Sequence, residues 1–313
     1  MFSSIYKKIK ASFVFLLIIL NTLSIGAVFY ALMPFKIIFW GYPEVLISRL
    51  FNFLATIWIS INGFFLDRIA GVKINTDIPD SIHTKGWYLI VSNHQTWSDI
   101  LILQRIFNKK APFLKFFLKR QLIYVPVIGL VWWALDFPFM KRFSKQYLEK
   151  KPHMKGKDLE TTIKACEKFA HMPVAVMNFP EGTRNRKGKA QKMNSPFKNL
   201  IRPKAGGFSF VLEAMDGKID KIIDVTIHYS SKRPSLLEFL SGSIEDINVD
   251  VKIIDVEDWM VGSYLGDLSY RQRIQEFVNK LWEEKDLRLS RLSGSLKIPE
   301  KVDSGCDVRE LEN

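Results

Sequence analysis

The fold is decided by the stretch WYLIVSNHQTWSDILILQRIF, which covers residues 87–107. Residues 87–92 are a β-rich apolar run, a polar turn follows at once, and residues 100–107 return to the apolar spacing of a helix. A strand that leads directly into a turn and a helix is the repeating unit of parallel sheets. The same order recurs where residues 174–179 run into a glycine-containing turn.

Other segments extend this pattern along the chain. Residues 222–229 and 247–256 have the composition of strands, and residues 157–170 and 270–282 have helical spacing. Strands that alternate with helices predict an α/β fold with a mainly parallel sheet covered by helices. We therefore expect ligands at the carboxyl ends of the strands, where open α/β sheets bind them.

The N-terminal part is hydrophobic enough to enter a membrane. Residues 11–35 carry no charge, and roughly 20 apolar residues suffice for a helix to cross a bilayer. Basic residues flank this run on both sides, namely Lys7, Lys8, Lys10 and Lys36. A cleaved signal peptide is the alternative, but the run exceeds the apolar core of such peptides and no A-x-A pattern closes it. We expect a retained anchor.

A second uncharged run, residues 50–66, is marginal as a span because it contains Asn52, Asn62 and Gly63. It either crosses the bilayer or forms a re-entrant or interfacial helix. The α/β fold is therefore expected to follow an N-terminal hydrophobic membrane helix or helical hairpin. The predicted division is an anchor over residues 1–68, one folded domain over 69–298 and a flexible tail over 299–313.

Composition narrows the partners and the compartment. The 313 residues include 45 Lys and Arg against 32 Asp and Glu, which gives a formal net charge of +13. This excess favours an anionic partner, whether a nucleic acid, an anionic lipid or a phosphorylated substrate. Two cysteines, Cys166 and Cys306, cannot form a disulfide framework, so a reducing compartment is expected.

The turn after the first strand carries a candidate general base. His94 precedes Asp99, which would lie in the first turn of the following helix. If the turn folds back, Asp99 accepts the Nδ1 proton of His94 and leaves Nε2 free to take a proton from a substrate. The alternative is that Asp99 caps its helix and His94 is a hydrogen-bonded core residue.

The turn after the second strand, Phe179-Pro180-Glu181-Gly182-Thr183-Arg184, is a candidate anion site. Gly182 lets the backbone approach an anion, the hydroxyl of Thr183 can donate to it, and the planar guanidinium of Arg184 suits two phosphate oxygens. The alternative is an ordinary loop with a solvated arginine. Residues 182–204 hold eight basic side chains and no acidic one, which favours an anion-binding surface: Arg184, Arg186, Lys187, Lys189, Lys192, Lys198, Arg202 and Lys204.

These motifs together resemble the lysophospholipid acyltransferase family, of which the 1-acylglycerol-3-phosphate acyltransferases are members. NHQTWSD at 93–99 resembles its first motif, FMKR at 139–142 its second and FPEGTR at 179–184 its third. Val225-Thr226-Ile227 lies where the fourth is expected, but the family usually has proline in the middle. That departure resembles the lysocardiolipin acyltransferases and a membrane-bound bacterial branch.

The resemblance implies roles for particular residues. His94 would be the catalytic base, oriented by Asp99, and Arg142 and Arg184 would bind the phosphate of the acceptor. Phe139, Phe179, Pro180, Gly182 and Thr183 would complete the substrate site, and Glu181 would orient its turn. No cofactor is implied, because acyl-CoA or acyl carrier protein enters as the donor substrate. No metal is expected either, since the five histidines are scattered and no H-E-x-x-H occurs.

The expected function is transfer of an acyl chain to 1-acyl-sn-glycerol-3-phosphate, giving phosphatidic acid. Lysocardiolipin and lysophosphatidylglycerol are alternative acceptors. A serine lipase is disfavoured because no G-x-S-x-G occurs, and a membrane-tethered nucleic-acid-binding protein would leave both turns without a purpose. The expected location of this acyltransferase domain is the cytoplasmic face of an inner membrane, where thioester donors are made. Its partners would be membrane lipids and the donor, and no nucleic acid is expected.

Overall fold

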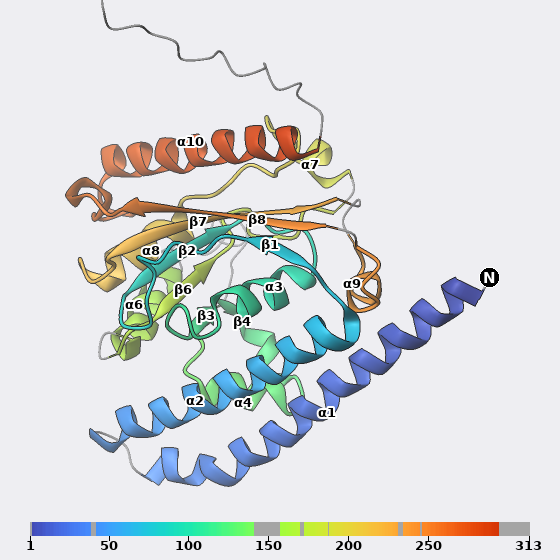
Figure 1. Ribbon diagram of the computed structural model, residues 1–313. Helices are drawn as coiled ribbons and strands as arrows, with labels where there is room; N and C mark the ends of the chain where they lie inside the picture. The colour runs from blue at the N-terminus through green and yellow to red at the C-terminus, as the bar shows by residue number, and fades with distance from the viewer. Residues whose placement is uncertain are drawn as a thin grey trace, which may run out of the picture.

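The computed structural model describes residues 2–38, 42–140, 157–169, 172–186, 188–230, 234–244 and 246–293, and these form a sheet with helices on both faces (Figure 1). The six strands run in the order β1 (Ile74–Thr76), β8 (Ile247–Asp255), β7 (Lys221–Tyr229), β2 (Tyr88–Ser92), β6 (Ala175–Asn178) and β3 (Leu114–Phe116). All neighbours pair in parallel except β7 and β8, which are antiparallel. The prediction of a mainly parallel, helix-covered sheet is confirmed.

Alternate residues of the central strands β2 and β6 serve two hydrophobic cores. Along β2, Tyr88 and Ile90 belong to one core, whereas Leu89 and Val91 belong to the other. The first core is shared with five helices, α1 (Phe2–Ile38), α2 (Tyr42–Phe64), α3 (Ser98–Phe107), α4 (Ile128–Ala134) and α9 (Leu236–Leu240). The second is shared with α6 (Lys157–Phe169), α8 (Gly206–Met215) and α10 (Leu268–Leu292).

Short elements connect these layers. β4 (Leu118–Lys119) and β5 (Phe139–Met140) form a separate parallel pair. A π-helical segment, η1 (Phe65–Ala70), continues directly from α2. The remaining short helices are η2 (Arg120–Tyr124), α7 (Lys189–Lys192) and η4 (Asp258–Met260).

The two N-terminal helices lie against one helical layer of the sheet (Figure 1). Both are long and apolar enough to cross a membrane, α1 over Ser3–Lys36 and α2 with η1 over Leu46–Ala70. Near the end of α1, the ammonium of Lys36 donates to Asp136 Oδ1 at 2.8 Å and to the carbonyl of Ala134 at 2.6 Å. Ser48 of α2 donates to the other oxygen of Asp136 at 3.0 Å.

Helix α10 is longer than its sequence pattern predicts. The prediction ended at Trp282, but the helix continues through the four charged residues that follow and ends at Leu292. Lys285 is fully buried there and donates to Asp224 Oδ1 and to the carbonyl of Val225, both at 2.6 Å. Burial lowers the pKa of Lys285, whereas the Asp224 carboxylate opposes that shift. Lys285, within this charged run, therefore attaches α10 to β7.

Strand register brings both sequence motifs to one edge. β2 pairs in parallel with β6, which places Val91 beside Asn178, and with β7, which places Ser92 beside Val225. The segments that follow β2 and β6 therefore emerge next to each other, together with the last residues of β7. This is the edge at which the sequence predicts a ligand.

Candidate functional site

His94 and Asp99 form a hydrogen-bonded pair in the turn after β2. Asp99 Oδ2 lies 2.8 Å from His94 Nδ1, and it also accepts the backbone N–H groups of Gln95 at 2.5 Å and Thr96 at 2.9 Å. The Asp99 side chain is fully buried, whereas 13% of the His94 side chain is exposed. The prediction that the turn folds back on the first turn of α3 is confirmed. This contact leaves Nε2 of His94 outside the pair.

Tyr229, at the end of β7, contacts the same carboxylate. Its hydroxyl donates to Asp99 Oδ1 at 2.6 Å. Burial raises the pKa of Tyr229 well above its usual range, and the charge of Asp99 adds to this shift. The hydroxyl therefore stays protonated and acts as a donor. Tyr229 was not among the predicted site residues. The available signal was its position as the last residue of the predicted strand 222–229.

Asn93 and Gln95 fasten the turn to β7. The amide of Asn93 donates to the carbonyl of Ile227 at 2.9 Å and accepts from the N–H of Ile227 at 2.8 Å. The amide of Gln95 also donates to the carbonyl of Ile227, at 2.9 Å. Asn93 is completely buried, and its side chain pairs with the backbone of Ile227 as an adjacent strand would. This pairing fixes the position of the neighbouring His94.

The turn after β6 holds the backbone of His94 from the other side. Glu181 Oε1 accepts the N–H of His94 at 3.2 Å, and the carbonyl of His94 accepts the N–H of Asn185 at 2.7 Å. Glu181 Oε2 accepts the N–H of Ile201 at 3.4 Å. Burial raises the pKa of Glu181 to about 8, although these two backbone donors oppose the shift. Glu181 and the equally buried Pro180 therefore shape the turn from within the protein.

An aromatic side chain of the same turn covers the imidazole. The ring of Phe179 stacks on the ring of His94 with centroids 4.1 Å apart and planes at 18°. The ring centroid of Phe179 in turn lies 6.4 Å from the ring centroid of Phe116 in β3. Phe139 belongs to the two-stranded sheet and pairs with Leu118, just beyond β3. Arg142, the second predicted phosphate ligand, lies outside the described residues.

A groove of about 1010 Å³ opens beside the pair. Arg184 lines it, and its guanidinium lies 4.2 Å from the ring centre of the exposed Trp97. Burial and the neighbouring charge of Arg186 lower the pKa of Arg184, as expected for a cation held among other cations. Arg186, Lys198 and His228 also line the groove, and Glu238 is the carboxylate among its described lining residues.

The other two predicted anion donors are partly engaged within the protein. Gly182 has a φ of 68°, which suits glycine, and its N–H donates to the carbonyl of Phe179 at 2.8 Å. The hydroxyl of Thr183 accepts from Lys189 at 2.6 Å, so its own proton remains for another acceptor. Of the eight basic residues in 182–204, Arg184, Arg186 and Lys198 reach the groove, and Lys187 lies outside the described residues. Within the described part of the chain, no three His, Cys, Asp or Glu side chains lie together as a metal site.

Comparison with known proteins places this site in a family. The model of the acyltransferase family matches residues 73–230, slightly more than half of the chain. The probable 1-acyl-sn-glycerol-3-phosphate acyltransferase 5 of Arabidopsis thaliana is 25% identical over 237 aligned residues, which cover 69% of this chain and 60% of that protein. The 2-acyl-1-lysophosphatidylinositol acyltransferase of Saccharomyces cerevisiae is 25% identical over 258 aligned residues, covering 67% of this chain and 62% of that protein.

This chain thus spans about 60% of the length of these two relatives. The crystal structure of the 1-acyl-sn-glycerophosphate acyltransferase PlsC from Thermotoga maritima superposes with a TM-score of 0.48 at 16% identity, over 90% of this chain and 100% of that one. The family match includes β2, β6 and β7 and both turns that meet at His94. This chain therefore belongs to the acyltransferase family.

Proposed function

We propose that the chain transfers an acyl group from a thioester donor to the free hydroxyl of a lysophospholipid. The observation that carries this proposal is the His94–Asp99 pair at the carboxyl ends of β2, β6 and β7, beside a groove that contains Arg184. The pair supplies a general base, and the groove supplies cationic groups for a phosphate. Family membership supports the same reaction class.

In the proposed reaction, Nε2 of neutral His94 takes the proton of the acceptor hydroxyl as its oxygen attacks the thioester carbonyl. When the intermediate collapses, the carbon–sulfur bond breaks and the imidazolium returns the proton to the leaving thiolate. Asp99 holds the ring through Nδ1 and stabilises its charged form. A direct transfer is favoured over an acyl-enzyme, because Cys166 is buried in α6 with its pKa raised to about 12 and Ser98 is fully buried.

The proposed acceptor is 1-acyl-sn-glycerol-3-phosphate, whose phosphate would bind Arg184, and the donor would be acyl-CoA or acyl carrier protein. One relative is named for lysophosphatidylinositol, so another lysophospholipid is the second candidate. Thr226, which stands where the resemblance favours proline, lies on the α10 side of β7 and accepts from Lys285 at 3.3 Å. This residue therefore faces away from Tyr229 and the pair, and it supports neither acceptor over the other.

The test is release of free thiol by the purified full-length chain with a panel of lysophospholipids that share one acyl chain and differ in head group. We expect release that requires both an acyl donor and a lysolipid, fastest with 1-acyl-sn-glycerol-3-phosphate. Faster turnover with an inositol, glycerol or cardiolipin head group would reassign the acceptor and keep the reaction. Thiol release that does not depend on any lysolipid would contradict acyl transfer.

We propose further that α1 and α2 lie along one face of the bilayer as a hairpin, with the catalytic pair on the cytoplasmic side. Helix α1 has 37 residues and is about 55 Å long. Ala11 and Val14 in its first half are buried in the sheet core, and Lys36 near its end is paired with Asp136. Since both halves of α1 contact the same folded unit, the helix does not project from it as a crossing helix would.

A further inference from the structure

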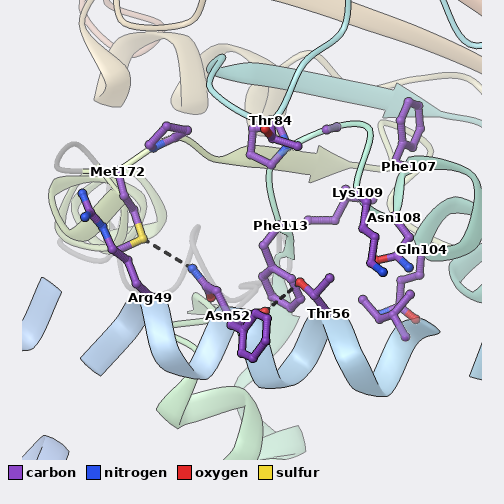
Figure 2. A pocket seen from close by; sticks show the side chains of 16 residues that line it. Arg49, Asn52, Thr56, Thr84, Gln104, Phe107, Asn108, Lys109, Phe113 and Met172 are labelled. Carbon is purple, nitrogen blue, oxygen red and sulfur yellow. Dashed lines mark hydrogen bonds between the residues drawn. The ribbon is translucent and has the colours of Figure 1, made fainter. Parts of the chain in front are cut away.

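Two cavities of the protein differ in how their cationic side chains are placed. One, of about 340 Å³, lies between α2 and the domain, and Arg49 and Lys109 are in its lining (Figure 2). The amide of Asn108 donates to Ser60 of α2 at 2.9 Å, so Lys109 lies about 16 Å along α2 from Arg49. These two cations stand at opposite ends and do not share one anion. The groove beside His94 has a different arrangement, because one of its cations rests on an aromatic ring.

In that groove, Arg184 lies over the indole of Trp97, with the guanidinium carbon 4.2 Å from the ring centre. This is a cation–π contact, for which Trp is the strongest aromatic partner. Within the described part of the chain, the guanidinium makes no hydrogen bond and no ion pair. The contact occupies the face of the planar group, so the N–H donors in its plane remain for an anion.

The position of Trp97 in α3 does not explain why it is a tryptophan. Trp97 is at the N-cap, where Ser, Thr, Asp and Asn are the usual residues, and its side chain makes no capping hydrogen bond. It is 54% exposed and belongs to neither hydrophobic core. The contact that the structure does give this ring is the one with Arg184.

The turn after β2 holds Arg184 at both ends. The N–H of Asn185 donates to the carbonyl of His94 at 2.7 Å, which fastens the backbone next to Arg184. Trp97 follows His94 by three residues and holds the guanidinium. A long side chain that is ordered only when substrate binds loses conformational entropy at that moment and weakens binding. An Arg184 already held on Trp97 avoids much of this loss, and its separation from the imidazole is set in advance.

We propose that Trp97 is a positioning residue for the acceptor. Its indole holds the guanidinium of Arg184 where the phosphate of the lysophospholipid binds while the acceptor hydroxyl lies at Nε2 of His94. This inference rests on the proposed function, in which Arg184 binds that phosphate. Trp97 acts through Arg184 and not on the reacting atoms, so it should affect acceptor binding more than donor binding or the chemical step. The contact requires an aromatic face, so Phe can replace Trp97 and Leu cannot.

Steady-state kinetics of the full-length chain with 1-acyl-sn-glycerol-3-phosphate test this role. Trp97→Leu should raise the KM for the acceptor by about three- to thirtyfold, the range expected for a cation–π contact, with little change in kcat or in the KM for the donor. Trp97→Phe should recover most of the loss. In the Arg184→Ala background, Trp97→Leu should add little, because the side chain that it positions is gone.

The matched control is Tyr264→Leu. It removes a ring that also lies under an arginine, with the guanidinium carbon of Arg271 5.2 Å from the ring centre, but neither residue lines the groove. Its acceptor KM should equal that of the wild type. Membrane association and melting temperature of Trp97→Leu and Trp97→Phe should match each other, since the ring belongs to neither core.

A binding measurement separates this inference from the reaction. The His94→Ala chain in phosphatidylcholine nanodiscs is titrated with 1-acyl-sn-glycerol-3-phosphate, with nanodiscs that lack protein as the reference. Adding Trp97→Leu should weaken binding by the same factor as in the kinetics, and adding Trp97→Phe should not. Weakened binding of this kind, without lysolipid-dependent thiol release by the wild type, would reject the proposed reaction and keep the positioning role.

Three results would overturn the inference. The first is equal acceptor binding with and without Trp97→Leu. The second is an equal loss with Trp97→Phe and Trp97→Leu, which would show that the size of the tryptophan matters and not its aromatic face. The third is a loss of the same size in the Arg184→Ala background, which would show that Trp97 acts independently of Arg184.

Discussion

Both carboxylate oxygens of Asp99 accept hydrogen bonds. Oδ2 accepts from His94, Gln95 and Thr96, and Oδ1 accepts from Tyr229. A carboxylate with this many donors is held in one orientation. The imidazole of His94 is held by Asp99 on its edge and by Phe179 on its face. The pair is thus oriented before any substrate binds, which is the arrangement that a general base requires.

Replacing His94 with alanine should reduce acyl transfer by about 10² to 10⁴-fold, the usual cost of losing a general base. Asp99→Asn should be milder, because the ring stays in place on Phe179 but loses the carboxylate that selects its tautomer. The rate of thiol release at saturating substrate measures the activity of both variants. The melting temperature and membrane association of both variants should match the wild type. A folded His94→Ala with normal turnover would remove His94 from the mechanism.

Tyr229→Phe should lower kcat by about tenfold, since a hydrogen bond to a charged group contributes about 1.5 to 3 kcal/mol. KM for the acceptor should change little, because Tyr229 acts through Asp99. In the Asp99→Asn background, Tyr229→Phe should reduce kcat much less, as expected for two residues of one hydrogen-bond network. Tyr88→Phe is the matched control, since its hydroxyl contacts the N–H of His83 at the other end of β2. Equal losses in both backgrounds would show that Tyr229 acts independently of Asp99.

Glu181 should make stability depend on pH. Its pKa is about 8 in the folded chain, above the ordinary value of a glutamate, so the folded state keeps a proton that the unfolded state has already lost. The free energy of unfolding should therefore decrease as pH rises from about 4.5 to about 8. Thermal unfolding of Glu181→Gln across this range should give a flatter profile. Parallel profiles would mean that Glu181 stays ionised in the folded protein.

At the scale of elements, α1 is joined to the segment after α4 by a buried ion pair. The side chains of Lys36 and Asp136 are 6% and 9% exposed, so each would be left as an unpaired charge without the other. Asp136 also has a φ of 58°, a left-handed conformation that Asp and Asn tolerate better than most residues. The pair therefore fixes both the end of α1 and a turn of the domain.

Lys36→Met should destabilise the detergent-solubilised protein by about 3 to 5 kcal/mol, the usual cost of removing one partner of a buried pair. Lys36→Met combined with Asp136→Asn should recover much of that loss, because no charge is then left buried. Thermal unfolding of the two single variants and the double variant measures the coupling. Lys8→Met, at the exposed start of α1, is the control. If the two single losses simply add, the ion pair does not hold α1 to the domain.

The long or strongly patterned elements were predictable, whereas the short ones were not. β2, β6, β7 and β8 match the predicted strands to within a residue or two, because each is an apolar run bounded by turn residues. β1 and β3 have three residues each, which is too short for a period. The antiparallel direction of β8 also escaped prediction, since the sequence of a strand does not encode the direction of its neighbour.

The site was predictable where its residues are close in sequence. His94 and Asp99 are five residues apart, so the geometry of one turn brings them together. Tyr229 lies 130 residues from Asp99 and reaches it only through the pairing of β2 with β7. Val225, Ile227 and Tyr229 share one face of β7, so the pairing of two predicted strands would have pointed to it. Whether these residues catalyse the reaction stays a prediction.

At the scale of the whole molecule, the hairpin and the domain share one hydrophobic core. Val14 and Phe29 of α1 and Phe51 of α2 are completely buried in the same cluster as Ile90 and Ile223 of the sheet. The outward faces of both helices are apolar, with Phe53 and Phe64 among the exposed side chains. In the proposed placement, this surface lies in the interfacial layer of a membrane and holds the domain there.

The proposed placement predicts that Ile38, at the end of α1, stays on the cytoplasmic side. A chain with Ile38→Cys and Cys306→Ser should not react with a membrane-impermeant maleimide added outside intact cells, and should react after permeabilisation. Ile38 is 71% exposed and Cys166 is buried, so the introduced thiol is the one that reports. Labelling from outside would show that α1 crosses the bilayer.

A reporter pair fused after Asn313 checks the side of the domain independently. A fluorescent protein that matures in the cytoplasm should be bright, and alkaline phosphatase, which works only outside, should be inactive. Both a one-leaflet hairpin and a double crossing give this result, so the maleimide experiment is needed to separate them. Phosphatase activity would place His94 away from its thioester donor and contradict the proposed location.

The shared core has a consequence for how the chain is made. The ribosome delivers α1 and α2 before any strand of the sheet, so Val14, Phe29 and Phe51 emerge long before Ile223 exists to cover them. During that interval the hydrocarbon of the bilayer is the solvent available for these side chains. Lipid would thus occupy the place of the sheet until the later strands are synthesised and displace it. Maturation of this enzyme then amounts to an exchange of lipid for protein across one face of a helical hairpin.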